Sequence, residues 1–142
     1  ICRFHTDPED AFSYSDDGRA IEAWWDMADF DGSSFYRNKT VRLFAIRLAA
    51  ATATSIVLKA LIRGRWTELK RIMSKARYFS FAKLTFSKFT FSSDTTPKTI
   101  AQKIKVKKVD KTRFRLENRE KNEPFGIYEV SIEFTESGRY KR

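Results

Sequence analysis

Residues 38–63 read NKTVRLFAIRLAAATATSIVLKALIR, and the prediction of the fold class depends mainly on this stretch. Its large apolar side chains recur at steps of three and four residues, which is the spacing of an α-helix. The series consists of Leu43, Ile46, Ala50, Ala53, Val57 and Leu61. Because Phe44, Leu48 and Leu58 widen the apolar stripe, we expect a central, buried helix over 38–63.

The same stretch is too short to cross a membrane. Its uncharged run, Leu48–Leu58, has eleven residues and lies between Arg47 and Lys59, whereas a spanning helix needs about 20 apolar residues. Four of the eleven are Ala and three are Ser or Thr. A core helix is therefore the better interpretation.

Two shorter helices are expected, over about 18–30 and over 66–77. Aspartates directly before the first can cap it, and Gly64 separates the second from the central helix. The first helix carries Trp24 and Trp25, which are a large apolar load for a short element. We therefore expect these two tryptophans to contact the rest of the domain or a partner.

From residue 78 onwards, large apolar residues alternate with polar ones, as is typical of β-strands. The alternation predicts strands over 79–91, 100–109, 111–118 and 126–135. Short polar loops between them favour an antiparallel sheet.

Helices followed by strands predict an α+β fold, in which the N-terminal helices pack on a C-terminal antiparallel sheet of about four strands. In this interpretation residues 1–17 form an acidic irregular arm and residues 18–142 form a single domain. The chain of 142 residues is long enough for one domain with a sizeable core.

Charge is divided unevenly along the chain. Residues 1–35 hold nine acidic and two basic residues, a net charge of −7, whereas residues 36–142 hold 26 basic and nine acidic residues, a net charge of +17. Such asymmetry indicates an interaction surface. Two arrangements remain open: the acidic segment lies across the basic body and shields part of it, or it points away and leaves the body free to meet a polyanion.

The basic residues best suited to polyanion contact lie in the expected third helix and in the strands. They are Arg65, Lys70, Arg71, Lys75, Arg77, Lys83, Lys88, Lys103, Lys105, Lys107, Lys108, Arg113 and Arg115. Aromatic residues are interleaved with several of them, and exposed aromatics can stack on unpaired bases. Because phenylalanine has no polar group and these phenylalanines share one face, core packing is the favoured interpretation.

No arrangement of side chains indicates catalysis, a cofactor or a metal. His5 is the only histidine and Cys2 the only cysteine, which excludes an internal disulfide and a zinc site built on thiolates. Residues 29–32, Asp-Phe-Asp-Gly, resemble part of a calcium loop, but Met27 and Asn38 stand where that loop needs carboxylates.

We therefore expect a non-catalytic structural or assembly protein. Its basic surface docks on a polyanion (nucleic acid, nucleoprotein or an anionic membrane face) or on an acidic protein. Trp24 and Trp25 are the candidate contacts to a partner or to a neighbouring copy in an oligomer. The alternatives are an RNA- or single-strand-binding module that uses an aromatic and basic sheet face, and a small enzyme with an unrecognised site. The single cysteine and the lack of a signal or membrane segment favour an intracellular protein.

Overall fold

The computed structural model describes residues 14–48, 54–74, 97–121, 123 and 125–139. These residues form nine β-strands, and no helix occurs among them. The strands are β1 (Ser15–Asp16), β2 (Arg19–Ala20), β3 (Ala23–Asp26), β4 (Arg37–Leu48), β5 (Thr54–Ile62), β6 (Arg65–Ser74), β7 (Lys98–Val109), β8 (Arg113–Asn118) and β9 (Ile127–Arg139). The expected α+β fold is therefore wrong for the described part of the chain, which is all-β.

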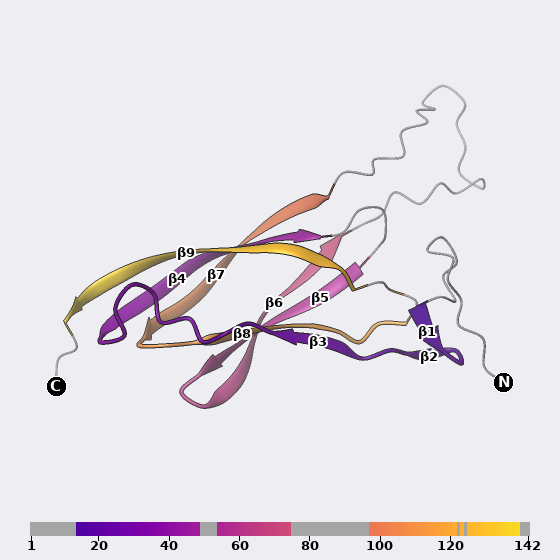
Figure 1. The fold of residues 1–142 in the computed structure, drawn as a ribbon, viewed down its shortest axis with the longest axis horizontal. Helices are drawn as coiled ribbons and strands as arrows, with labels where there is room; N and C mark the ends of the chain where they lie inside the picture. The colour runs from indigo at the N-terminus through magenta and orange to yellow at the C-terminus, as the bar shows by residue number, and fades with distance from the viewer. Residues whose placement is uncertain (1–13, 49–53, 75–96, 122, 124, 140–142) are drawn as a thin grey trace, which may run out of the picture.

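Two antiparallel sheets pack face to face (Figure 1). One has four strands in the order β3-β8-β5-β6, and the other has three in the order β7-β4-β9. β1 and β2 form a separate hairpin. From β3 onwards the chain passes from one sheet to the other at every connection except the β5–β6 hairpin. Such crossings are typical of β-sandwiches with Greek-key connections.

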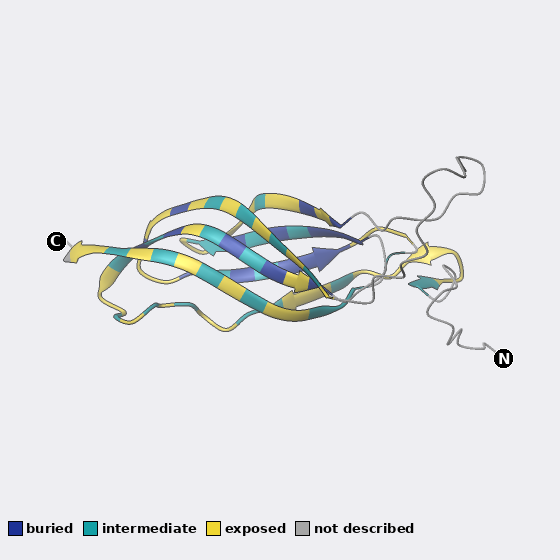
Figure 2. Ribbon diagram, turned by 90° about the horizontal axis from the view of Figure 1, so that it is seen from above, coloured by how far each residue is buried: buried dark blue, intermediate teal, exposed yellow. Residues whose placement is uncertain are grey.

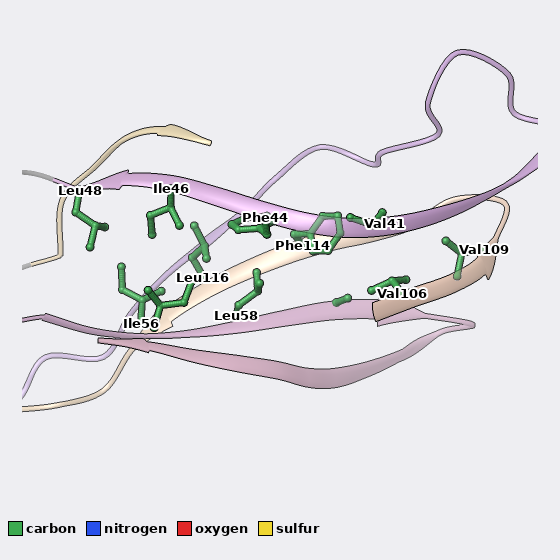
Figure 3. Packing of buried hydrophobic residues seen from close by; sticks show 12 residues of the cluster. Val41, Phe44, Ile46, Leu48, Ile56, Leu58, Val106, Val109, Phe114 and Leu116 are labelled. Atoms are coloured by element: carbon green, nitrogen blue, oxygen red, sulfur yellow. The ribbon is translucent and has the colours of Figure 1, made fainter. Parts of the chain in front are cut away.

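The apolar core lies between the two sheets (Figure 3). Phe44 on β4 points towards Phe114 on β8, and the ring centroids are 5.3 Å apart. Among the described residues, twelve buried hydrophobic side chains form the core, and they come from β4, β5, β6, β7 and β8. Along β4 and β7, residues that face the core alternate with more exposed ones (Figure 2). Each fully buried large apolar side chain contributes about 1.5–3 kcal/mol.

β4 and β5 take the place of the helix expected over 38–63. In β4, Phe44, Ile46 and Leu48 alternate with residues of the outward face, as in any strand. Val41 also faces the core, three residues before Phe44, because β4 advances by two residues there while β9 advances by one. The bulge thus produces a three-residue step that resembles helical spacing.

β5 and β6 show two further ways in which strands imitate a helix. β5 is apolar on both faces, since Val57 and Leu61 on its outward face are half-buried. In β6 the register against β5 skips Leu69, so that Leu69 and Ile72 both pack on the core. The expected helix over 66–77 is therefore wrong as far as residue 74, and residues 75–77 lie outside the described residues.

Two tight turns contradict the expected helix boundaries. Asp17 and Gly18 have φ angles of 46° and 74°, and Arg63 and Gly64 have φ angles of 51° and 79°. Each pair joins two antiparallel strands directly. Positive φ at both central residues is the conformation of a two-residue type I′ hairpin, whose twist suits the strands on either side.

The helix expected over 18–30 is also wrong, because β3 occupies its centre and pairs with β8. Phe30 makes an isolated antiparallel bridge to Thr112. The strands expected over 100–109, 111–118 and 126–135 correspond to β7, β8 and β9. The strand expected over 79–91 lies outside the described residues, and the described chain contains no helix able to span a membrane.

Candidate polyanion-binding surface

β7 presents a row of lysines on the outward face of the three-stranded sheet. Lys103, Lys105 and Lys107 are exposed, whereas Ile104 and Val106 between them pack on the core. Because a strand advances about 3.3 Å per residue, lysines two positions apart lie roughly 7 Å apart on one face. The row therefore extends over about 13 Å.

Lys108 adds a fourth cation at the end of this row. Its φ is 52°, and a register shift against β4 inserts an extra residue before Val109. As a result Lys107 and Lys108 both face solvent, while Val109 returns to the core. Within the described ranges, none of these four lysines has a carboxylate at ion-pair distance.

Neighbouring strands add further exposed cations. Arg42 lies on β4, in the irregular stretch opposite β7, and is not among the expected contacts because a central, buried helix is expected there. β6 lies alongside β7 at this side of the sandwich and carries exposed Arg65 and Lys70. Neither has a carboxylate partner among the residues that the structure describes.

The opposite edge of the same sheet is acidic. Lys103 on β7 is registered with Leu43 on β4, and Leu43 is registered with Glu133 on β9. Glu133 is exposed, and Glu129 lies four residues away on the same outward face, where its carboxylate pairs with Arg47 at 2.8 Å. Since strands are about 4.8 Å apart, positive and negative edges are separated by roughly 10 Å.

The arginines of β8 are neutralised by carboxylates from the chain's own N-terminal part. Arg115 donates to both carboxylate oxygens of Asp26, from Nε at 2.5 Å and from Nη2 at 2.7 Å. Arg113 donates from Nε to Asp29 at 2.8 Å, and Lys111 lies 3.8 Å from the same carboxylate. The first of the two arrangements left open above is therefore correct for β8.

These contacts set the protonation of the two aspartates. The hydrogen bond from Arg115 lowers the pKa of Asp26 below its ordinary value, against the opposing effect of burial. In the same way the hydrogen bond from Arg113 lowers the pKa of Asp29. The hydrogen bond to Asp26 raises the pKa of Arg115. All three groups are therefore held in their charged forms.

Arg115 is also fixed from two other sides. Its guanidinium lies 4.3 Å from the centroid of the Trp66 ring, a cation–π contact between β8 and β6. Its Nη1 is 3.7 Å from Glu117, a buried carboxylate whose closest cation is Lys59 Nζ at 2.7 Å. This face is a connected charge network with little capacity for an external anion.

The candidate residues thus separate into three groups. Those exposed without a carboxylate partner among described residues are Arg65, Lys70, Lys103, Lys105, Lys107 and Lys108. Those paired with carboxylates are Arg71 (with Glu120, 3.2 Å), Arg113 and Arg115. Lys75, Arg77, Lys83 and Lys88 lie outside the described residues.

The two candidate partner contacts lie on β3, at the edge of the four-stranded sheet. Trp24 is 60% exposed and Trp25 is 44% exposed. Trp24 lines a cavity of about 250 Å³ together with Arg115 and Glu117, and Trp25 lines one of about 270 Å³ together with Tyr128. The tryptophans therefore line two different cavities rather than one face of a helix.

Comparison with protein-family models, curated proteins and solved structures finds no match for this chain. Among the described residues, no three His, Cys, Asp or Glu side chains come together as a metal site requires. Any functional inference therefore depends on the surface chemistry of the chain itself.

Proposed function

We propose that this protein is a non-catalytic docking protein that binds a linear polyanion, such as the phosphate backbone of a nucleic acid, along β7. The observation that carries the proposal is the row of Lys103, Lys105 and Lys107, which share one face and have no carboxylate partner within the described ranges. Lysine contacts to phosphate release counterions and give an affinity that depends on salt but not on sequence.

The distribution of charge on the three-stranded sheet, basic at β7 and acidic at β9, favours a linear anion over a flat anionic surface. A chain of phosphates can follow β7 without approaching β9. A flat membrane placed on the same face would bring its lipid headgroups close to the exposed Glu133, about 10 Å from Lys103, and like charges would repel. Arg65 and Lys70 extend the positive region around the β7 side, away from β9.

Binding led by charge fits the described surface better than base stacking. The β4 residues registered with the outward positions of β7 include Leu43 and Ala45, and aromatic residues are missing from this part of the described sheet face. A stacking platform needs aromatic rings beside the cations. We therefore place the contact on phosphates rather than on bases.

The test is the affinity of the protein for a 20-nucleotide single-stranded RNA, measured by fluorescence anisotropy between 50 and 200 mM salt. The triple variant Lys103→Gln, Lys105→Gln, Lys107→Gln should bind at least about ten-fold more weakly at low salt. The slope of log affinity against log salt should become shallower by about two, because each lost phosphate contact removes about 0.7.

The matched control is the triple variant Arg19→Gln, Arg119→Gln, Lys121→Gln. These three residues are also exposed and lie outside β6 and β7, so the variant loses the same net charge outside the proposed binding surface. It should keep most of the affinity and the slope. Equal losses in the two variants would show that net charge alone drives binding, and tighter binding to anionic vesicles than to RNA would contradict a linear ligand.

A further inference from the structure

A tight turn between β3 and β4 displays two aromatic rings to solvent. Arg37 N donates to Ser34 O at 3.2 Å, which closes a β-turn that we call the aromatic turn. Its two central residues, Phe35 and Tyr36, are 77% and 51% exposed, and their ring centroids are 5.7 Å apart. Such positions usually hold Gly, Pro, Asn, Asp or Ser. Two large rings at this tip therefore serve neither the turn nor the core.

Hydrogen bonds fix the backbone of the aromatic turn on two sides. Lys39 is fully buried, and its ammonium donates to the carbonyl oxygen of Ser34 and, at 2.8 Å, to that of Asp110. Glu136 on β9 accepts from Ser33 Oγ at 2.6 Å and from Ser33 N at 3.1 Å. The bond from the Ser33 hydroxyl lowers the pKa of Glu136, so its carboxylate stays charged and bound. A fixed backbone lowers the entropy that the two rings lose on binding a ligand.

The same buried ammonium places the aromatic turn beside the end of the lysine row. Because one Nζ binds both oxygens, the carbonyls of Ser34 and Asp110 lie within roughly 6 Å of each other. Phe35 directly follows the first of these residues, and Lys108 lies two positions before the second. Figure 1 shows the β3–β4 connection and the β7–β8 turn at the same end of the sandwich, where an isolated bridge also joins them. The two rings therefore adjoin the end of β7.

The charge around the aromatic turn favours a neutral group over a phosphate. Asp31 and Asp110 are exposed beside it, and the nearest cation, Arg37, is 3.7 Å from the carboxylate of Glu136. The lysine row, in contrast, has no carboxylate partner within the described ranges. A polynucleotide matches both regions, because its phosphates are charged and its bases are neutral rings that stack on aromatic side chains. An anionic membrane would be repelled by the acids at the turn.

We propose that the aromatic turn is a base-stacking subsite at the end of the lysine row, so that the ligand is a single-stranded nucleic acid. This inference rests on the proposed phosphate contacts along β7 and narrows the ligand from linear polyanions to strands with unpaired bases. β7 has no aromatic residue, so stacking is confined to the turn. The lysines bind phosphates, and a base beyond the row stacks on Phe35 or Tyr36.

The ligand test compares two fluorescein-labelled single strands of DNA, each 20 nucleotides long. They carry the same phosphates, but one has mixed bases and the other is abasic throughout. In anisotropy measurements on the full chain, the strand with bases should bind at least about five-fold more tightly. Both strands should show the same dependence of affinity on salt, because they share the phosphate contacts. Equal affinities would overturn the proposal.

The double variant Phe35→Ala, Tyr36→Ala locates the subsite. It should weaken binding of the strand with bases at least about five-fold and remove the difference between the two strands, with an unchanged salt slope. The matched control, Trp24→Ala with Tyr128→Ala, removes two other exposed rings, on β3 and β9, and should retain the difference. Equal losses in the two variants would contradict the assignment to the turn.

Two further variants separate stacking from general hydrophobic contact. Phe35→Leu with Tyr36→Leu keeps apolar side chains at these exposed positions but removes the rings, so it should lose the preference for bases as the alanine variant does. Tyr36→Phe retains a ring and should keep that preference. Full base preference in the leucine variant would contradict stacking. Binding to phosphatidylserine vesicles that is tighter than binding to DNA, and is lost in the alanine variant, would identify the turn as a membrane contact instead.

The same measurements distinguish a failure of this subsite from a failure of the lysine row. The lysine triple variant should weaken binding of both strands alike and keep the ratio of their affinities. Unchanged binding of the abasic strand in that variant would contradict the proposed function. Weaker binding of the abasic strand, together with equal affinities of the two strands for the unmodified protein, would contradict the stacking subsite alone.

Discussion

The β7 lysines and the β8 arginines arise from the same sequence pattern, yet they are in opposite states. On both strands basic residues alternate with core residues and face outwards. β8 lies between β3 and β5, and the chain around β3 supplies Asp26 and Asp29 to its arginines. β7 is an edge strand, and β4, its one hydrogen-bonded neighbour among the described strands, offers its lysines no carboxylate. Availability for an external anion is thus decided by the neighbouring strand.

The acidic N-terminal part therefore acts locally. It neutralises Arg113 and Arg115, which lie next to β3 in the four-stranded sheet, but it does not reach the lysines on β7 in the part of the chain that the structure describes. Net charge along the sequence suggested one continuous basic body. The fold divides that body into a paired face, where carboxylates bind Arg113 and Arg115 on β8, and an unpaired edge, which is the lysine row on β7.

The largest effect should come from Arg115→Ala. This change removes a two-point hydrogen bond to Asp26 and leaves buried Glu117 with one cation fewer. We expect the free energy of unfolding to fall by about 1–3 kcal/mol, measured by urea denaturation. Lys105→Ala should change it by less than about 0.5 kcal/mol, as is usual for an exposed site. Similar decreases in the free energy of unfolding for the two variants would contradict the claim that Arg115 is paired and Lys105 is not.

The paired face can be converted into an unpaired one. Asp26→Asn with Asp29→Asn should release Arg115 and Arg113, so RNA affinity should rise several-fold and the salt slope should steepen by about one. The control, Asp16→Asn with Asp31→Asn, makes the same change in net charge at two exposed acids that have no cation partner among the described residues. An equal rise in the control would mean that the released arginines do not act as new contacts.

Acid should affect the paired face first. The pKa of Asp26 and the pKa of Asp29 are lowered in the folded chain, so their contribution to stability is present above the unfolded value near 4 and is lost as the pH falls through the folded value. The free energy of unfolding should therefore be nearly constant from pH 7 to about 5 and then decrease. The Asp26→Asn variant should show a smaller decrease between pH 5 and 3, and identical decreases would contradict the pairing.

The smallest effect should come from Lys105→Gln alone. Removing the middle lysine of the row should reduce RNA affinity only a few-fold and make the salt slope shallower by about 0.7. Arg113→Gln should leave the slope unchanged, since its guanidinium already binds Asp29. A larger change in the salt slope for Arg113→Gln than for Lys105→Gln would indicate that RNA contacts β8 rather than β7.

Sequence periodicity identified strands in which inward and outward residues alternate regularly. It failed for strands in which a bulge interrupts the alternation. β9 could be predicted because the residues of its outward face are polar along the whole middle part of the strand. β4 and β6 could not, because bulges near Arg42 and at Leu69 shift the alternation and imitate a helix. Asp17-Gly18 was a usable hairpin signal that was interpreted as part of a helix start.

The candidate site could be predicted in part for the same reason. Alternation with Ile104 and Val106 places the β7 lysines on one outward face, and this can be read from the sequence. The pairing of Arg113 with Asp29 and of Arg115 with Asp26 joins residues 84 and 89 positions apart, so no local pattern contains it. Strand order, which only the tertiary structure supplies, decides which cations remain free.

The most direct test of the central claim is the chemical reactivity of individual lysines, with and without bound RNA. Acetylation followed by mass spectrometry reads each lysine separately. Bound RNA should protect Lys103, Lys105 and Lys107, while exposed Lys121 and Lys111, the latter beside Asp29, should react as before. Equal protection of all five lysines, or protection of Lys111 and Lys121 alone, would contradict the assignment of the polyanion to β7.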